Sequence, residues 1–183
     1  LGQAWIDLAN CLEQEGDPEG AEESIKNALK VWTYSPIVHW QAGNYYLTQG
    51  NLEKMYRHFR TAIAYDTGKL DIALQVAWRV EPDPSRILLM LVPDEIAANW
   101  SALAFFVARG ELDLAGKAWS RLMQNPLPEN SPIQLSAAFP YMDALLSKSR
   151  VQDAYRVWVE SQKKFLPRLE TARSGPQLKT DFT

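Results

Sequence analysis

Apolar positions recur along this chain with the period of an α-helix, and the pattern itself repeats. Gly16 and Gly50, which stand 34 residues apart, each close one helix-like run and open another. When the chain is shifted by that length, small residues fall on small residues and large residues on large residues. Two antiparallel helices require this, because small residues allow a close crossing and large residues fill the seam between the helices. The superposed pairs are Trp5 with His39, Ala9 with Gly43, Leu12 with Tyr46, Ile25 with Phe59, and Ala28 with Ala62. The sequence therefore predicts helical hairpins over about 2–34 and 36–67.

The third repeat is irregular. A helix pair is expected over 69–92, but Pro84 stands where a glycine is due, and Pro93 ends the second helix after about two turns. Gly110 restores the register and predicts a fourth hairpin over 94–125.

A fifth hairpin is expected over 131–165, with a kink at Pro140 in its first helix. Trp158 in this pair copies the position of Trp119 in the fourth, and both are expected in the core together with Trp5. Residues 166–183 are expected to form a polar tail or linker.

Helix starts support this layout independently. Asp17-Pro18, Asp83-Pro84 and Ser131-Pro132 each place a capping side chain before a proline in the first helical turn. Between turn signals, no window alternates apolar and polar residues over a useful length. The predicted fold class is all-α, with about ten helices and no sheet.

The glycines and packing columns resemble the tetratricopeptide repeat, a helical hairpin of this length. The resemblance implies a right-handed α-solenoid, here a single domain over 1–165 with one shortened repeat. It also implies a binding scaffold, because such arrays hold a partner's peptide or helix in their concave groove.

The family also suggests which residues line that groove. Its inner wall is formed by the residue after the first packing position and by residues three or four further along. Carried onto this chain, the wall residues are Ile6, Asn10, Gln14, Trp40, Asn44, Thr48, Trp78 and Trp100. Trp40 is expected to be accessible because His39 already fills the packing position. Alternatively, Trp78 and Trp100 plug the core beside the shortened repeat.

Some members grip a terminal carboxylate with lysine or arginine on this wall. Here the corresponding positions hold Ile6, Asp71 and Gln75, which argues against that activity.

The formal net charge of −3 is unevenly spread, with acidic residues concentrated in the first 23 positions and basic residues in the last third. Two interpretations stay open: solvated helix faces, or a head-to-tail contact or acidic partner at the carboxyl end. The acidic balance argues against nucleic acid as a partner, and no apolar run is long enough for membrane insertion.

Residues with catalytic or metal-binding chemistry are few. His39 and His58 are the only histidines, and neither has a second ligand at metal-binding spacing. Cys11 has no basic neighbour in sequence and is expected to be a small packing residue. The sequence thus predicts no catalytic residue, no metal site and no cofactor.

The function expected is a non-catalytic protein-protein interaction or assembly scaffold. The alternative is a regulatory or substrate-presenting helical domain attached to an enzyme or envelope protein, since Leu1 is not a methionine and the chain reads as part of a longer polypeptide. A helical enzyme with a tryptophan-lined sugar site is a third reading, and it would need paired carboxylates beside Trp40 or Trp100. Both cytoplasmic and periplasmic locations fit, and oligomeric state is not predicted.

Overall fold

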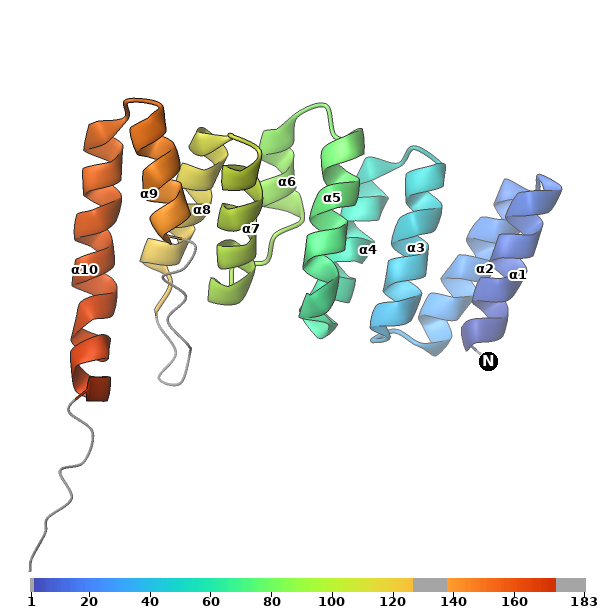
Figure 1. Ribbon diagram of the computed structural model, residues 1–183. Helices are drawn as coiled ribbons and strands as arrows, with labels where there is room; N and C mark the ends of the chain where they lie inside the picture. The colour runs from blue at the N-terminus through green and yellow to red at the C-terminus, as the bar shows by residue number, and fades with distance from the viewer. Residues whose placement is uncertain (1, 127–137, 174–183) are drawn as a thin grey trace, which may run out of the picture. The chain divides into compact units, whose positions relative to one another are not determined.

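The computed structural model describes residues 2–126 and 138–173, with side chains in the second range described through residue 165. Within these residues the chain forms ten α-helices, one 3-10 turn and no strand, which confirms the all-α prediction. In chain order (Figure 1) they are α1 (Gly2–Glu15), α2 (Pro18–Val31), α3 (Pro36–Thr48), α4 (Leu52–Tyr65), the 3-10 turn η1 (Thr67–Lys69), α5 (Leu70–Val80), α6 (Pro84–Met90), α7 (Ile96–Ala108), α8 (Leu112–Gln124), α9 (Ala138–Ser147) and α10 (Val151–Arg173).

Four of the helix pairs turn in the same way. Each turn has one residue with a positive φ, between 58° and 80°; these residues are Gly16, Gly50, Gly110 and Ser149. At the second turn, the Gly50 amide donates to the Leu47 carbonyl over 3.0 Å and the Asn51 amide donates to the Tyr46 carbonyl over 2.8 Å. This pair of bonds is the Schellman motif, and the other three turns repeat it. The regular spacing of the glycines in the sequence therefore reflects a turn conformation that these helix pairs share.

The chain divides into two compact units, residues 1–94 and 95–183, where the sequence predicted one domain over 1–165. The division follows the shortened third repeat. Each unit is described below by itself.

The first unit contains three helix pairs arranged in two layers. Helices α1, α3 and α5 form one layer, and α2, α4 and α6 form the other (Figure 1). The predicted packing columns are its core: Ile25, Phe59, Ala28 and Ala62 are almost completely buried. Gly43 lies against the Phe59 ring so closely that a Cβ atom would collide with it. The small residue at this crossing is therefore required by the large one across the seam.

The irregular third repeat has the expected form. α6 begins at Pro84 and has only 7 residues, and it ends before Pro93. Asp83 caps this helix by accepting from the Ser85 amide over 3.0 Å, as Asp17 caps α2 by accepting from the Gly20 amide over 2.9 Å. The third predicted cap, at Ser131, lies outside the described residues.

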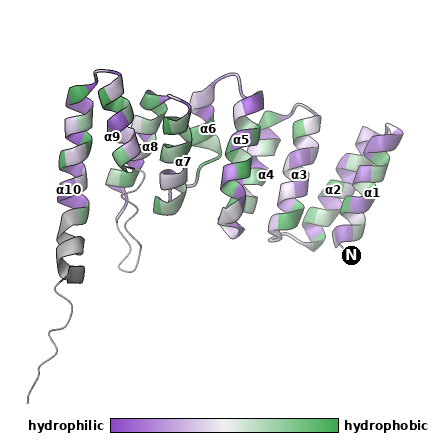
Figure 2. Ribbon diagram, in the orientation of Figure 1, coloured by the Kyte–Doolittle hydropathy of each residue, from purple (hydrophilic) through white to green (hydrophobic). Residues whose placement is uncertain are grey.

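The second unit pairs α7 with α8 and α9 with α10. Hydrophobic residues continue around much of α7, which is mostly green in Figure 2. The Trp119 ring contacts Tyr141 of α9, and its indole N–H donates to Glu160 of α10 over 2.6 Å. Lys164 of α10 donates to carbonyl groups at the end of α8, including that of Met123.

The carboxyl end differs from the expectation. α10 runs to Arg173, so the polar tail predicted to start at residue 166 is wrong in its boundary. Pro167 stands next to the expected end of the helix, but the helix continues through it. The expected start of the preceding helix at residue 131 lies outside the described residues, while the described part of α9 continues through Pro140.

Candidate protein-interaction surface

Six of the eight predicted groove residues line one layer of the first unit. We call the surface formed by Asn10, Gln14, Trp40, Asn44, Thr48 and Trp78 the first-helix face, because these residues lie on α1, α3 and α5. Asn10, Gln14 and Thr48 are exposed, whereas Trp40, Asn44 and Trp78 are half-buried. Ile37, exposed by 53%, lies seven residues before Asn44 and so extends this face along α3.

Ile6 and Trp100 do not belong to an open surface, so their assignment to the groove wall was wrong. Ile6 is exposed by only 1% and Trp100 by only 3%. The Trp100 ring lies edge-on to Trp119 at 6.1 Å and close to Phe165 at 5.9 Å. Trp100 is therefore a core residue of the second unit, as the alternative for this residue expected.

Trp40 is half-buried because it has a packing role of its own. Its ring stacks on the buried ring of Phe59, with 4.5 Å between centroids and 23° between planes. The Lys69 ammonium lies 5.2 Å from the centroid of the Trp40 ring. The expectation that Trp40 packs against nothing was thus wrong, because Phe59 reaches across the hairpin beneath it. Trp40 is nevertheless partly exposed and so contributes to the first-helix face.

Hydrogen bonds hold the carboxyl ends of α1 and α3 together. Glu13 of α1 accepts from the Thr48 hydroxyl over 2.6 Å and from the Gln49 side chain over 3.2 Å. Nearby, the Tyr45 hydroxyl donates to the Pro18 carbonyl over 2.9 Å, which links α3 to α2. These side-chain hydrogen bonds therefore fix the spacing of α1 and α3, two of the three helices that carry the first-helix face.

A charged cluster joins the second layer to the first. The Lys54 ammonium pairs with Glu22 at 2.7 Å, and the Tyr46 hydroxyl donates to the same carboxylate over 3.2 Å. The hydrogen bond from Lys54 lowers the pKa of Glu22 despite partial burial. Burial and the Glu22 charge raise the pKa of Tyr46 to about 12. The charge of Lys54 is therefore compensated within the first unit.

The two histidines, which the sequence placed on separate helices, meet across the second hairpin. Their Nδ1 atoms lie 3.0 Å apart, and His39 Nε2 lies 2.9 Å from the Thr33 carbonyl oxygen. His39 must donate from Nε2, so its Nδ1 accepts and His58 Nδ1 donates. Burial, with the His39 ring as a second cause, lowers the pKa of His58 to about 4. A signal existed in the sequence: both residues stand at similar distances from the Gly50 turn, as facing residues in a hairpin do.

Two residues expected to pack in the core are exposed instead. Cys11 is an exposed free thiol on α1, and Trp158 on α10 is exposed by 43%. Trp119, at the equivalent position of the preceding hairpin, is exposed by only 3%. Repeat position alone was a poor guide at the first and last helices, because burial there depends on a neighbouring helix pair.

The described residues bring together no group of three or more side chains of the kinds that hold metal ions. None of the described helices combines the length and the apolar composition that crossing a bilayer demands. Among the described residues, Phe59 and the Lys69 ammonium lie beside the Trp40 ring, and Trp119 and Phe165 lie beside the Trp100 ring.

Comparison with known proteins adds little to this picture. No protein-family model matches the chain, and no curated protein matches it. Among solved structures, the chain is similar to one titled "Crystal structure of MamA protein", at 16% identity over 97% of each chain with a TM-score of 0.40. The assignment of this chain to helical hairpins therefore rests on its own turns and packing columns.

Proposed function

We propose that this chain is a non-catalytic protein-interaction module that binds an extended or helical segment of a partner protein on the first-helix face. The observation that carries the proposal is the outer surface of α3. There an exposed apolar side chain, Ile37, and the half-buried Trp40 ring stand beside the polar side chains of Asn44 and Thr48.

This combination suits recognition of a peptide. Aromatic rings supply most of the binding energy in protein interfaces, and a ring already held by packing loses little entropy on binding. Trp40 is held in this way by Phe59. Amide side chains such as Asn44 both donate and accept, so they can bond the backbone of an extended segment whatever its sequence.

The electrostatics of the face favour a partner segment of mixed charge. Asp71 and Gln75 are exposed on α5, and Lys69 lies over the Trp40 ring. Lys69 already pairs with Asp66 at 3.5 Å, so a segment of mixed charge would offer an apolar side chain to Trp40 and a basic one to Asp71, next to this pair. A terminal carboxylate alone would face Asp71 without a compensating cation.

A peptide-display library panned against the full 183-residue chain tests the proposal. Enriched peptides should bind the parent chain and lose about tenfold or more in affinity to Ile37→Asp and Asn44→Arg, because both changes place charge in the centre of the face. The matched control is Leu89→Asp, an exposed apolar position on α6 in the opposite layer, which should bind as the parent does. The proposal fails if no peptide is enriched, or if the control loses binding while the two face variants keep it.

A further inference from the structure

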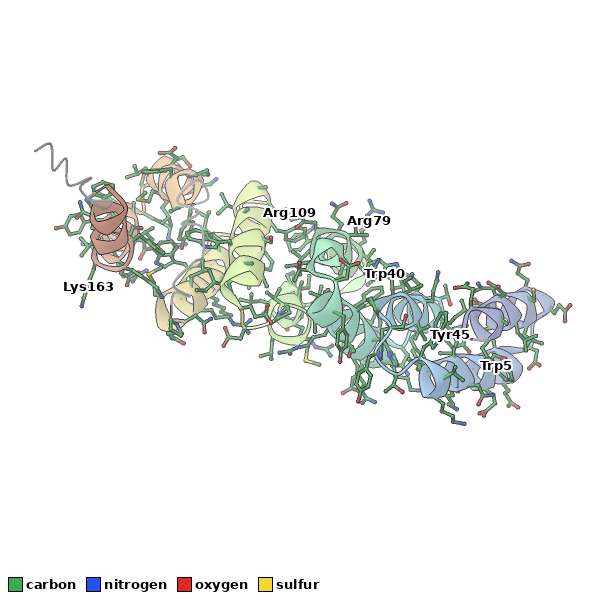
Figure 3. All side chains as sticks on the ribbon, turned by 90° about the horizontal axis from the view of Figure 1, so that it is seen from below. Trp5, Trp40, Tyr45, Arg79, Arg109 and Lys163 are labelled. Atoms are coloured by element: carbon green, nitrogen blue, oxygen red, sulfur yellow. The ribbon has the colours of Figure 1, made fainter. Side chains whose placement is uncertain are left out.

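The outer face of α10 carries an exposed apolar stripe. Val151, Tyr155, Trp158 and Val159 recur at helical spacing and are exposed by 60%, 68%, 43% and 41%. Lys163, which projects from this helix (Figure 3), and Arg156 lie along one border of the stripe. Single exposed apolar residues are ordinary, but four on one helical stripe mark a contact surface.

The repeat register identifies this stripe as a stacking surface. Trp158 stands nine residues after Ser149, as Ile25, Phe59 and Trp119 stand nine residues after the glycines of their turns. Those three side chains are exposed by 1%, 0% and 3%. Trp119 is covered by the helix pair that follows it, through Tyr141 and Glu160. No helix follows α10 among the described residues, so Trp158 occupies the same position without that cover.

The outer face of α1 carries the opposite kind of surface, the one that a preceding helix pair covers in the later repeats. Leu8, exposed by 42%, is equivalent to Ala42 and Tyr141 in later first helices, which are exposed by 0% and 1%. Tyr141 is covered by the pair that precedes it, where its hydroxyl meets the Leu112 carbonyl. Leu8 shares its exposed face with Ala4 and Cys11, and no described helix precedes it. α1 therefore presents the surface onto which a preceding helix pair would stack.

The charges beside the two stripes are opposite. Asp7 and Glu15 are exposed beside Leu8 on α1. Lys163 borders the stripe on α10 together with Arg156, which also pairs with Asp153 at 2.8 Å. Two apolar stripes bordered by opposite charges attract one another and discourage like-with-like pairing.

We propose that this chain associates head to tail with a second copy of itself, with α1 of one copy stacked on α10 of the next. The contact continues the stacking that each unit already uses internally, and buries Leu8 of one copy against Trp158 of the other. A head-to-tail contact uses two different surfaces, so each added copy leaves one surface of each kind free, and the assembly grows unless it closes into a ring. Because it involves little more than one helix on each side, the association should be weak and dependent on concentration. The inference is independent of the proposed function, which uses other residues.

Sedimentation velocity of the full 183-residue chain, measured over a range of concentrations, gives the first test. We expect species larger than the monomer at high concentration, and fewer of them at high salt, because salt screens the charge attraction. Leu8→Glu and Trp158→Glu should each weaken self-association by about tenfold or more, since each puts a charge in the centre of one stripe. Leu89→Glu is the matched control on α6 and should associate as the parent does.

Mixing the two variants distinguishes a head-to-tail contact from the pairing of two identical stripes. Leu8→Glu has a disrupted α1 stripe and an intact α10 stripe, and Trp158→Glu has the reverse, so neither variant should associate with itself. In the mixture, the intact α10 stripe of the first can bind the intact α1 stripe of the second. The mixture should therefore form a one-to-one dimer that does not grow further. Tyr155→Glu replaces Trp158→Glu if the latter unfolds. Lys163→Glu should weaken the contact, and Asp7→Lys in the partner copy should restore it.

Three results would overturn the proposal. A parent chain that stays monomeric at all concentrations would show that α1 of one copy does not stack on α10 of another. Unchanged self-association of Leu8→Glu would show that two α10 stripes pair with each other. Mixed variants that remain monomeric would exclude the head-to-tail contact.

Discussion

Acid should weaken the second hairpin through the histidine pair. His39 donates from Nε2 to the Thr33 carbonyl, which leaves its Nδ1 as the acceptor for the His58 N–H at 3.0 Å. A second proton on His58 would place a cation in a half-buried site beside Lys54 and Arg57 of the same helix. The Tyr46 ring, stacked on His58 at 5.4 Å, closes the site on another side.

The magnitude follows from the pKa. Burial first, and then the His39, Arg57 and Lys54 charges, lower the pKa of His58 from 6.5 to about 4. Below pH 6.5 the unfolded chain binds a proton at this residue, and the folded chain does not until the pH approaches 4. The contribution to stability is therefore fully present above pH 6.5 and is lost as the pH falls toward 4, by about 3 kcal/mol at most.

Urea titrations of the parent and of His58→Asn at several pH values measure this effect. Asparagine keeps an N–H that can donate to His39 but cannot gain a proton. Carboxylates titrate in both proteins, so the difference between the two curves isolates His58. The free energy of unfolding of the parent should fall relative to the variant as the pH drops from 6.5 to 4. Parallel curves over that range would refute the assignment of His58 as the neutral donor.

The other predictions concern packing and turns, and thermal or urea unfolding measures each of them. Ala62→Leu should destabilise the chain by about 1–3 kcal/mol, because the position is completely buried; an unchanged melting temperature would contradict the register. Trp40→Ala should cost about 1–3 kcal/mol through the lost stack on Phe59, so a change within about 0.5 kcal/mol would show that the stack is not populated. Ser149→Gly should stabilise by about 1 kcal/mol, because Ser149 has φ of 58°, whereas Gly50→Ala should destabilise by about as much at φ of 68°.

The sequence by itself determined the hairpins. Helix periodicity, glycine in the left-handed turn position, and capping residues before proline all act within a few residues of the chain, so they can be read without the fold. Gly16, Gly50 and Gly110 marked the turns, and Pro84 with Pro93 marked the short α6. The repeat also placed Gly43 at a close helix crossing and Phe59 in the seam, and the structure shows that these two residues meet.

Exposure and long-range pairing were decided only by the tertiary structure. Trp119 and Trp158 hold the same place in their repeats, yet only Trp119 is buried, because a second helix pair covers it. Trp40 and His58 depended likewise on what reaches them from a neighbouring helix, Phe59 in one case and His39 in the other. A side chain's place on its own helix is set by local geometry, whereas the cover over it comes from residues far away in the chain, so local patterns predict the first and leave the second to the fold.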